Sequence, residues 1–372
     1  MMNEVLLTSI CRPKQWKTIA STDLHEIGYP VYGANGKIGF YDTYTHEHPT
    51  VLITCRGATC GTINICEPKS YVNGNAMALD NLSSNVDMYY LKHYLEFRKL
   101  NDVISGSAQP QITGQGLSKV KIPLPPLPQQ QKIANILDAA DALRQNDKAL
   151  IAKYDELTQA LFLDMFGDPV SNPKGWEKVS GKEVFKLIGG AAFKSSDYTS
   201  TGVPLIRIGT VNKGYFDNSQ LAFLPKPFEE THSRYIVYPN DLLITLTGTV
   251  GKDDYGNCFA LTCEFEKYLL NQRVAKICSS DNYNLVFLKF YLKQKKVKNE
   301  LIGVSRGVRQ ANLSNEDFYK LEVINVQIDL QNKFAKRVAL IEEQKAIAQK
   351  SLVKSEELFN SLLQKAFKGE IK

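Results

Sequence analysis

The sequence predicts an α+β fold: two strand-rich globular domains separated by two long, antiparallel, coiled-coil-like helices, with a pseudo-twofold internal repeat. Two observations predict it. Apolar residues recur at helical spacing along two long segments, and many residues recur after a shift of 201 positions, as Lys132 and Lys333 do. The predicted boundaries are a globular domain at 1–125, a helical region at 126–170, a second globular domain at 171–325 and a C-terminal helical region at 326–372.

The first long helix is predicted from an apolar stripe that only Asp147 interrupts. Its members alternate in steps of three and four, which places them on one helical face that needs a partner. Prolines at 125, 126 and 128 stiffen its start, and Gly167, followed by Pro169, ends it. The residues expected to pack are Ile133, Ile136, Ala140, Leu143, Leu150, Tyr154, Leu157 and Leu161.

The partner helix is expected in the same chain. The shift of 201 aligns Gly106 with Gly307, Gln109 with Gln310 and, at the helix end, Phe166 with Phe367, without a gap. A repeat on this scale predicts two copies of one structural unit. The second copy has its own packing stripe: Phe334, Val338, Ile341, Ala348, Leu352, Phe359 and Leu362.

Composition indicates an ordinary globular protein. Hydrophobic residues make up 43% and charged residues 23%, and the net charge is +6. This mildly basic balance permits a nucleic-acid partner. No apolar run reaches membrane-spanning length, and Glu4 makes the N-terminus unlike a secretory signal. The seven cysteines, never spaced CxxC, are interpreted as free thiols in a reducing cytoplasm, with a zinc site near Cys55, Cys60 and Cys66 as the alternative.

Each globular domain contains a buried strand that leads into a glycine-rich segment. A strand at 50–54 precedes residues 56–61, and a strand at 241–245 precedes residues 247–252. Glycines with hydroxyl and basic residues let the backbone approach an anion closely. The alternative is a hairpin turn that needs positive φ. Pro-Lys-x-Trp occurs at 13–16 and again at 173–176, which suggests that each repeat begins there.

The second domain also has a lysine-rich helical stretch around residues 285–300, followed by Arg306 and Arg309. Such a strip is a candidate for phosphate contacts, and a solvated helix face is the alternative. Catalytic signatures are missing from the sequence: it has no phosphate-loop motif, no HExxH and no amino-methyltransferase motif. His46 and His48 are interpreted as a polar turn. Glu67 and Lys69 form a nuclease-like pair without a partner acid. The chain is therefore expected to be non-catalytic.

Several segments together carry a family resemblance. They are a GxxQxxI segment leading to IPLPPLPQQQKIA, a long helix ending LFLDMFGDP (161–169), the segment FKSSDY, a PLIRIG strand (204–209) and the twofold repetition. Over essentially its whole length the chain resembles the DNA-specificity subunit of Type I restriction–modification systems. It departs from the pattern at 323–330, where the second copy lacks the proline-rich lead-in.

The resemblance implies that each globular domain is a target-recognition domain for one half of a split double-stranded DNA site. It implies that the helices pack antiparallel and bind two DNA-methyltransferase subunits, and that restriction–translocase subunits join the complex. S-adenosylmethionine, ATP and Mg²⁺ would be bound by those partners, with no cofactor, metal or membrane for this chain. Two alternatives stay open: the specificity subunit of a Type IIB-like system, and a coiled-coil interaction scaffold without nucleic acid.

Candidate DNA-contacting residues follow from side-chain chemistry, because Arg, Lys, Asn and Gln read base edges while Lys, Arg, Ser and Thr contact phosphates. Gln109 and Gln310 have framework roles as an alternative. Exposed helix faces at 132–153 and 333–354 are expected to contact the methyltransferases. The candidates are, in the first domain, Arg56, Thr59, Lys69, Asn73, Asn75, Gln109 and Gln111, and in the second, Lys194, Ser195, Arg207, Thr247, Thr249, Lys252, Lys293, Lys296, Arg306, Arg309 and Gln310.

The two helices are expected to act as a ruler. A helix from Gln129 to Phe166 is about 57 Å long, enough to hold two domains over major-groove segments roughly 34 Å apart. Because the two domains differ in sequence, the expected target is asymmetric, with two short blocks around an unread spacer. Four helix-favouring residues inserted near Ala149 would lengthen the arm by about 6 Å, and the spacer should grow by about one or two base pairs.

Overall fold

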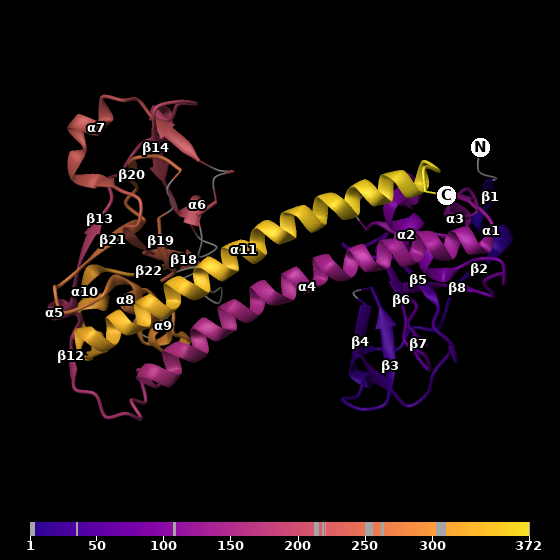
Figure 1. Cartoon of the computed structure of the whole chain (residues 1–372), viewed down its shortest axis with the longest axis horizontal. Helices are drawn as coiled ribbons and strands as arrows, with labels where there is room; N and C mark the ends of the chain where they lie inside the picture. The colour runs from indigo at the N-terminus through magenta and orange to yellow at the C-terminus, as the bar shows by residue number, and fades with distance from the viewer. Residues whose placement is uncertain are drawn as a thin grey trace. The chain divides into compact units, whose positions relative to one another are not determined.

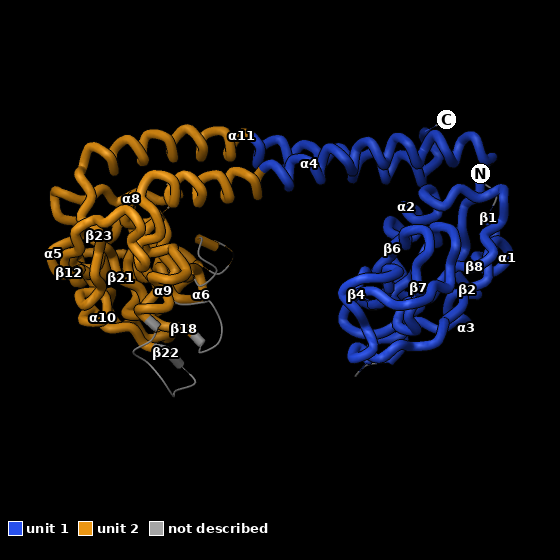
Figure 2. The backbone as a smooth tube through the Cα atoms, turned by 90° about the horizontal axis from the view of Figure 1, so that it is seen from below, with its two compact units in different colours: residues 1–150, 348–372 blue, residues 151–347 orange. Residues whose placement is uncertain are grey.

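The computed structural model describes residues 4–34, 36–106, 109–211, 216–217, 219, 221–249, 256–261, 264–302 and 310–371, apart from the side chains of residues 249, 302, 310 and 311. The chain divides into two compact units, Met1–Leu150 with Ala348–Lys372, and Ile151–Ile347 (Figure 2). Two forty-residue helices, α4 (Leu127–Phe166) and α11 (Ile328–Phe367), each contribute to both units.

The first unit is built on a four-stranded antiparallel sheet with strand order β2-β8-β5-β6 and a three-stranded sheet with order β4-β3-β7 (Figure 1). Two short pairs, β1-β11 and β9-β10, complete its strands. The bounds are β1 Glu4–Leu6, α1 Leu7–Ile10, β2 Arg12–Gln15, β3 Tyr29–Gly33, β4 Gly36–Tyr41, β5 Val51–Thr54, β6 Ile63–Ile65, β7 Tyr71–Val72, β8 Ala76–Asp80, α2 Met88–Arg98, β9 Ile104–Ser105, β10 Gln111–Ile112, α3 Gly114–Leu117 and β11 Lys121–Pro123.

The second unit repeats this plan with the sheets β13-β21-β17-β19 and β15-β14-β20-β16 and the pairs β12-β23 and β18-β22. The bounds are β12 Lys178–Ser180, α5 Gly181–Val184, β13 Phe185–Gly189, β14 Val203–Ile206, α6 Ile208–Val211, β15 Ala222–Leu224, α7 Phe228–Thr231, β16 Ile236–Val237, β17 Leu242–Thr245, β18 Thr247–Thr249, β19 Cys258–Ala260, β20 Tyr268–Leu270, β21 Val274–Ser279, α8 Leu285–Leu292, α9 Lys295–Ile302, β22 Gln310–Asn312, α10 Asn315–Tyr319 and β23 Glu322–Ile324.

The two copies of the repeat therefore share a topology, and the predicted α+β fold with an internal repeat is confirmed. In each unit the strand before the long helix, β11 or β23, receives a hydrogen bond from a buried tyrosine. Tyr90 Oη donates to the Pro123 carbonyl (2.7 Å) and Tyr291 Oη to the Glu322 carbonyl (2.9 Å). Burial raises the pKa of both hydroxyls, which keeps them as donors.

The Pro-Lys-x-Trp echo is not part of the structural repeat, so that prediction was wrong. Trp16 follows β2, whose counterpart is β13, whereas Trp176 precedes β12, whose counterpart is β1. Trp176 instead secures the end of α4, because its Nε1 donates to the Phe166 carbonyl (2.9 Å). The predicted strand at 204–209 also ends early: β14 stops at Ile206, and α6 begins two residues later.

In the first unit α4 and α11 run antiparallel. Gln129 Nε2 donates to the carbonyl of Ile371 (3.0 Å), and further along α4 Asp147 accepts from Ser355 Oγ (2.9 Å). The residue that interrupted the apolar stripe is thus a polar contact of the helix pair. A polar residue in such a seam favours one register over its alternatives.

The same direction holds in the second unit, where Asp155 on α4 pairs with Lys345 on α11 and Phe166 packs against Phe334 with ring centroids 5.2 Å apart. The stripe predicted on α11 is confirmed. Phe334, Val338, Ala348 and Phe359 are buried, and Ile341, Leu352 and Leu362 are partly buried.

The stripe predicted on α4 was only partly right. Ile133 and Ala140 are buried, Leu161 packs against the core of the second unit, and Ile136 and Tyr154 are half-buried. Leu143, Leu150 and Leu157 are instead 53%, 41% and 49% exposed. Next to them, polar or half-buried residues occupy the seam between the helices. Two of these are Asp147 and Arg144, and the guanidinium of Arg144 lies 4.4 Å from the ring centroid of Phe359.

Candidate nucleic-acid interface

In the first unit, the glycine-rich segment lies beside the GxxQxxI segment. Both segments contain residues that were selected from the sequence as candidate DNA contacts. Arg56 and Gln111 face each other in an antiparallel bridge. Their neighbours Cys55 and Ile112 are buried at 0% and 2% exposure, whereas Arg56 and Gln111 are exposed. Because side chains alternate along extended backbone and directly opposed residues share a face, these two point away from the core together. We call residues 54–61 with 109–112 the first tip.

The first tip is held by backbone geometry that only glycine tolerates well. Gly57 and Gly61 have φ values of +91° and +94°. The hydroxyls of Thr54 and Thr59 both donate to the carbonyl of Ala34, at 2.8 and 3.0 Å. The turn that needs positive φ is therefore present, and it serves to present Arg56 at an exposed corner.

The second unit builds the corresponding tip from β18 and β22, which pair antiparallel with Thr247 opposite Asn312 and Thr249 opposite Gln310. Leu246 and Leu313 are buried next to this pair, and Asn312 is exposed. The Leu313 amide donates to the Leu246 carbonyl (2.7 Å), as the Ile112 amide does to the Cys55 carbonyl (3.0 Å) in the first tip. We call residues 245–249 with 310–313 the second tip.

The glycine that closes the second tip is not the one predicted. In the first tip the Gly61 amide donates to the Thr54 carbonyl (2.8 Å), and in the second the Gly256 amide donates to the Thr245 carbonyl (3.0 Å). Gly256, rather than Gly251, is therefore the counterpart of Gly61. The second segment is four residues longer than the first, and Lys252 lies in its part outside the described residues.

Other candidates in the first unit occupy varied places. Lys69 is exposed with φ +54° and lies 3.9 Å from Glu47. Asn73 was wrongly placed among exposed residues: it is 3% exposed and its Nδ2 donates to the Ile19 carbonyl (3.1 Å). Asn75 is half-buried beside the first tip, where its carbonyl accepts from the Cys55 amide (3.0 Å). Gln109 is exposed.

In the second unit, Lys194 and Ser195 lie at the start of an exposed single-turn helix. Among the described residues, neither of them contacts the second tip. Arg207 is partly buried, with its guanidinium 5.1 Å from the ring centroid of Tyr198. The side chains of Thr249 and Gln310, and all of Arg306 and Arg309, lie outside the described residues.

The lysine-rich strip does not form one exposed face. It is divided between α8 and α9. Lys298 is 8% exposed and its Nζ donates to Asn257 Oδ1 (2.9 Å), next to the Gly256 turn. Lys296 pairs with Asp168 (2.6 Å), and the exposed Lys293 lies 5.9 Å from the Phe290 ring centroid. At least two of these lysines therefore stabilise the second unit itself.

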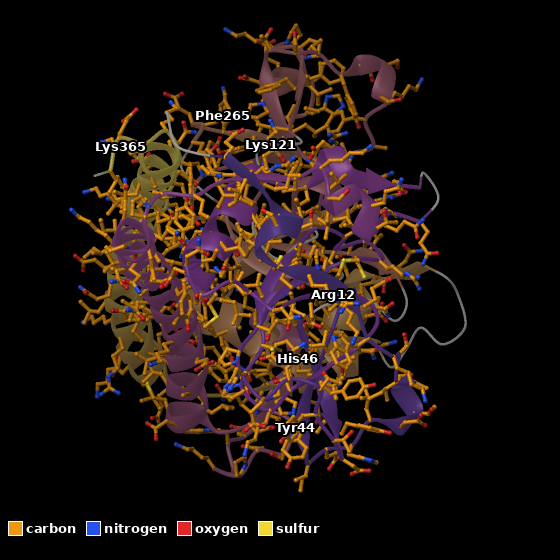
Figure 3. The ribbon with its side chains drawn as sticks, turned by 90° about the vertical axis from the view of Figure 1, so that its right-hand side faces the viewer. Arg12, Tyr44, His46, Lys121, Phe265 and Lys365 are labelled. Atoms are coloured by element: carbon orange, nitrogen blue, oxygen red, sulfur yellow. The ribbon has the colours of Figure 1, made fainter. Side chains whose placement is uncertain are left out.

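The histidines also have structural partners, and the prediction of a polar turn was wrong for His46. It is 9% exposed, and its Nε2 lies 2.9 Å from Asp80 Oδ1 among the strands of the first unit (Figure 3). His93, on α2, lies 2.7 Å from Asp138 Oδ1 on α4. Neither histidine is near a tip in any contact that the described residues show.

Within the described ranges, no group of three or more His, Cys, Asp or Glu side chains is arranged to hold a metal ion. The six cysteines there are free, and burial raises the pKa of Cys11 and of Cys258 to about 12, so both remain thiols. None of the described helices is both long and apolar enough to cross a membrane.

Two exposed polar residues of the second unit were missed by the sequence reasoning. Asn312 lies 201 positions after Gln111, so the repeat shift contained the signal for it. Arg273, directly before β21, is exposed, and its carbonyl accepts from the Leu246 amide (2.9 Å) at the base of the second tip. The shift of 201 does not find Arg273, because insertions inside the second domain change the local offset.

Comparison with known proteins gives a consistent match. The family model of the Type I restriction modification DNA specificity domain matches residues 2–153 and residues 173–354. The Type I restriction enzyme MjaVIII specificity subunit of Methanocaldococcus jannaschii is 23% identical over 339 residues, which cover 87% of this chain and 79% of that protein.

Two solved structures share the fold over nearly the whole chain. The Type I restriction–modification S subunit from M. genitalium matches with a TM-score of 0.64 and 17% identity, covering 98% of this chain and 96% of that one. A chain from a study of complex assembly and conformational transition of the type I R-M system matches with a TM-score of 0.53 and 16% identity, covering 98% and 97%.

Proposed function

This chain belongs to the Type I restriction modification DNA specificity family, and from this premise we propose that each of its units recognises one half of a split, asymmetric DNA target. It is a Type I specificity subunit with two DNA specificity domains. The observation that carries the proposal is that two tips have the same backbone frame and different exposed side chains. Two tips with the same backbone pairing but different exposed side chains are suited to a DNA target whose two halves differ in sequence.

The tips supply the chemistry of base recognition. Arg56 offers a guanidinium and Gln111 an amide on one exposed face of the first unit, and Asn312 offers an amide in the second. Arginine pairs bidentately with guanine, and Asn or Gln with adenine, in the major groove. Strands and strand ends can enter that groove. We therefore place base reading at the tips and phosphate contacts at other exposed residues, such as Lys69 and Lys194.

The long helices are proposed to bind two DNA-methyltransferase subunits. Leu143, Leu150 and Leu157 repeat every seven residues on α4 and are 41–53% exposed. An apolar row on the outside of a helix pair supports a role in docking another protein. Restriction–translocase subunits would join the same complex in the cytoplasm.

The chain itself is proposed to be non-catalytic. The described tips present amide, hydroxyl and guanidinium groups but no arrangement of acid, base and nucleophile. Methyl transfer from S-adenosylmethionine and ATP-driven reactions with Mg²⁺ are accordingly assigned to the partner subunits.

The test is to express the chain with its neighbouring methyltransferase in a host that lacks DNA methylation, and to map methylated bases by single-molecule sequencing. The proposal predicts one asymmetric motif with two specific blocks around an unspecified spacer. The methyltransferase expressed alone is the control and should not methylate that motif. Methylation that does not depend on this chain, or a motif without a spacer, would contradict the proposal.

A further inference from the structure

We propose that Arg273 is a specificity-determining residue that reads a guanine in the half-site recognised by the second unit. This inference rests on the proposed function and adds a residue that neither the repeat shift nor the candidate set contains. It follows from a structural equivalence between the turns that precede β8 and β21. These turns lie next to the two tips.

The two turns have the same backbone hydrogen bonds, which makes Arg273 the counterpart of Asn75. Each turn begins with an asparagine, Asn73 or Asn271, whose carbonyl accepts from the amide three residues later. The residue just before that amide accepts, through its own carbonyl, a hydrogen bond from the tip strand. At the start of the turns, the Asn73 amide donates to the Tyr32 carbonyl (2.8 Å), as the Asn271 amide does to the Ile206 carbonyl (3.0 Å). Across the turns, the Ala76 amide donates to the Asn73 carbonyl (2.8 Å), as the Val274 amide does to the Asn271 carbonyl (3.0 Å). Toward the tips, the Cys55 amide donates to the Asn75 carbonyl (3.0 Å), as the Leu246 amide does to the Arg273 carbonyl (2.9 Å).

Each tip thereby acquires three corresponding corners. The first has Arg56, Gln111 and the half-buried Asn75, and the second has Thr247, Asn312 and the exposed Arg273. Among the residues that the structure describes, each tip has one of these guanidinium groups, but at different corners. A guanidinium moved from one corner to another would meet a different base position, which is what an asymmetric target requires.

The Arg273 side chain is available for this role. It is exposed and makes no side-chain hydrogen bond or ion pair with the described residues. Two lysines of the second unit, by contrast, are paired within the protein, Lys298 with Asn257 and Lys296 with Asp168. Turn residues beside a rigid strand end can be positioned precisely enough for bidentate contact, and arginine with the O6 and N7 acceptors of guanine is the commonest such contact.

The experiment compares Arg273→Ala and Arg273→Lys in the full chain, co-expressed with the neighbouring methyltransferase and assayed by methylation mapping. Arg273→Ala should reduce methylation at the original motif roughly ten- to a hundredfold relative to sites that differ at one base of one half. The other half of the motif should not change. Arg273→Lys keeps the charge but loses the planar fork, so the same base requirement should relax.

Arg234→Ala is the matched control, because Arg234 is an exposed arginine of the second unit that precedes β16, in the other sheet. It should leave the motif as it is. An unchanged motif in Arg273→Ala would overturn the inference, and so would an equal loss at all sites or full activity in Arg273→Lys, which would indicate a phosphate contact. Failure of the proposed function would be visible separately, because the unsubstituted chain would then give no two-block motif.

Discussion

The fully buried side chains of Gln130 and Gln331 make the same three hydrogen bonds, one set in each unit. Each Oε1 accepts from the N-cap residue of a domain helix, α2 or α8, and each Nε2 donates to two carbonyls. The partners of Gln130 are the Asp87 amide (2.8 Å) and the carbonyls of Asn85 (2.9 Å) and Pro125 (2.8 Å), and those of Gln331 are the Asn284 amide (2.9 Å) and the carbonyls of Asn282 (3.1 Å) and Val326 (2.7 Å).

Each glutamine thus ties the first turn of a long helix to a globular domain. Gln130→Ala should lower the free energy of unfolding of the first unit by about 3 kcal/mol, because it removes three hydrogen bonds of a fully buried side chain and leaves its backbone partners unpaired. Chemical denaturation of the purified chain measures this. Gln131→Ala is the matched control, since Gln131 is exposed, and it should change stability by less than about 0.5 kcal/mol. Equal midpoints for the two variants would contradict the assignment.

Gly106→Ala should distort the first tip. A Cβ at Gly106 would lie 2.5 Å from the Gln109 carbonyl oxygen, and its φ is +87°. The close approach accounts for glycine at this position, and we expect the substitution to lower the free energy of unfolding by about 1–3 kcal/mol. Thermal unfolding and methylation mapping check it, with weaker recognition of one half-site expected. Gly114→Ala is the control, because a Cβ there meets nothing within 4 Å. Equal behaviour of the two variants would rule out the strain.

Acid should weaken the second unit through Asp168. Its pKa is lowered, first because Lys296 donates to Oδ2 (2.6 Å) and also because the Ser171 and Val170 amides donate to Oδ1, against the opposing effect of its burial. The folded pKa lies below the unfolded value of about 3.9. The stabilisation is therefore present above that value and is lost as pH falls through the folded pKa.

Lys296→Gln should raise the pKa of Asp168 and move this loss of stability to higher pH. NMR titration of the carboxyl carbon, with unfolding curves between about pH 5 and pH 2, measures the effect. Lys295→Gln, a change at the exposed neighbouring residue, should leave the titration of Asp168 as it is. If Lys296→Gln behaves like Lys295→Gln, the ion pair is not what lowers the pKa of Asp168. A contact with DNA phosphate would then be the better interpretation of the role of Lys296.

The spacer prediction requires insertions in both helices, because α4 and α11 pack against each other. Asp147 accepts from both Ser351 and Ser355, so an insertion in α4 alone would shift this register. One heptad after Ala149 and one after Leu352 keep the packing phase and add about 10.5 Å. If the helices set the distance between recognition domains, the unread spacer should grow by about three base pairs. An unchanged spacer in a folded variant would contradict the ruler.

The sequence was informative where one repeated physical requirement acts on both copies. The packing stripe of α11 was predicted correctly because the apolar residues that its helical spacing selects coincide with buried or partly buried positions, from Phe334 to Leu362. On α4 they do not coincide. Apolarity selected Leu143 and Leu150, which are exposed, whereas the seam contains Asp147, whose partners on α11 could not be identified from hydropathy.

The tips illustrate the same limit. The shift of 201 links Gln111 with Asn312 because no insertion separates them from the helices that follow. Asn75 and Arg273 lie inside the domains, where insertions change the offset and the residue types differ. Their correspondence follows from the matched backbone hydrogen bonds of the two turns, including those from Cys55 and Leu246. Burial also could not be read from residue type, as Asn73 shows.

We propose that each unit reads its own half of the DNA target. The most direct measurement exchanges residues 1–125, or separately residues 171–325, for the equivalent domain of a relative with a different target, and maps methylation produced with the same methyltransferase. We expect each exchange to replace one block of the motif and to leave the other block and the spacer unchanged. A motif in which both blocks change after a single exchange, or neither does, would contradict it.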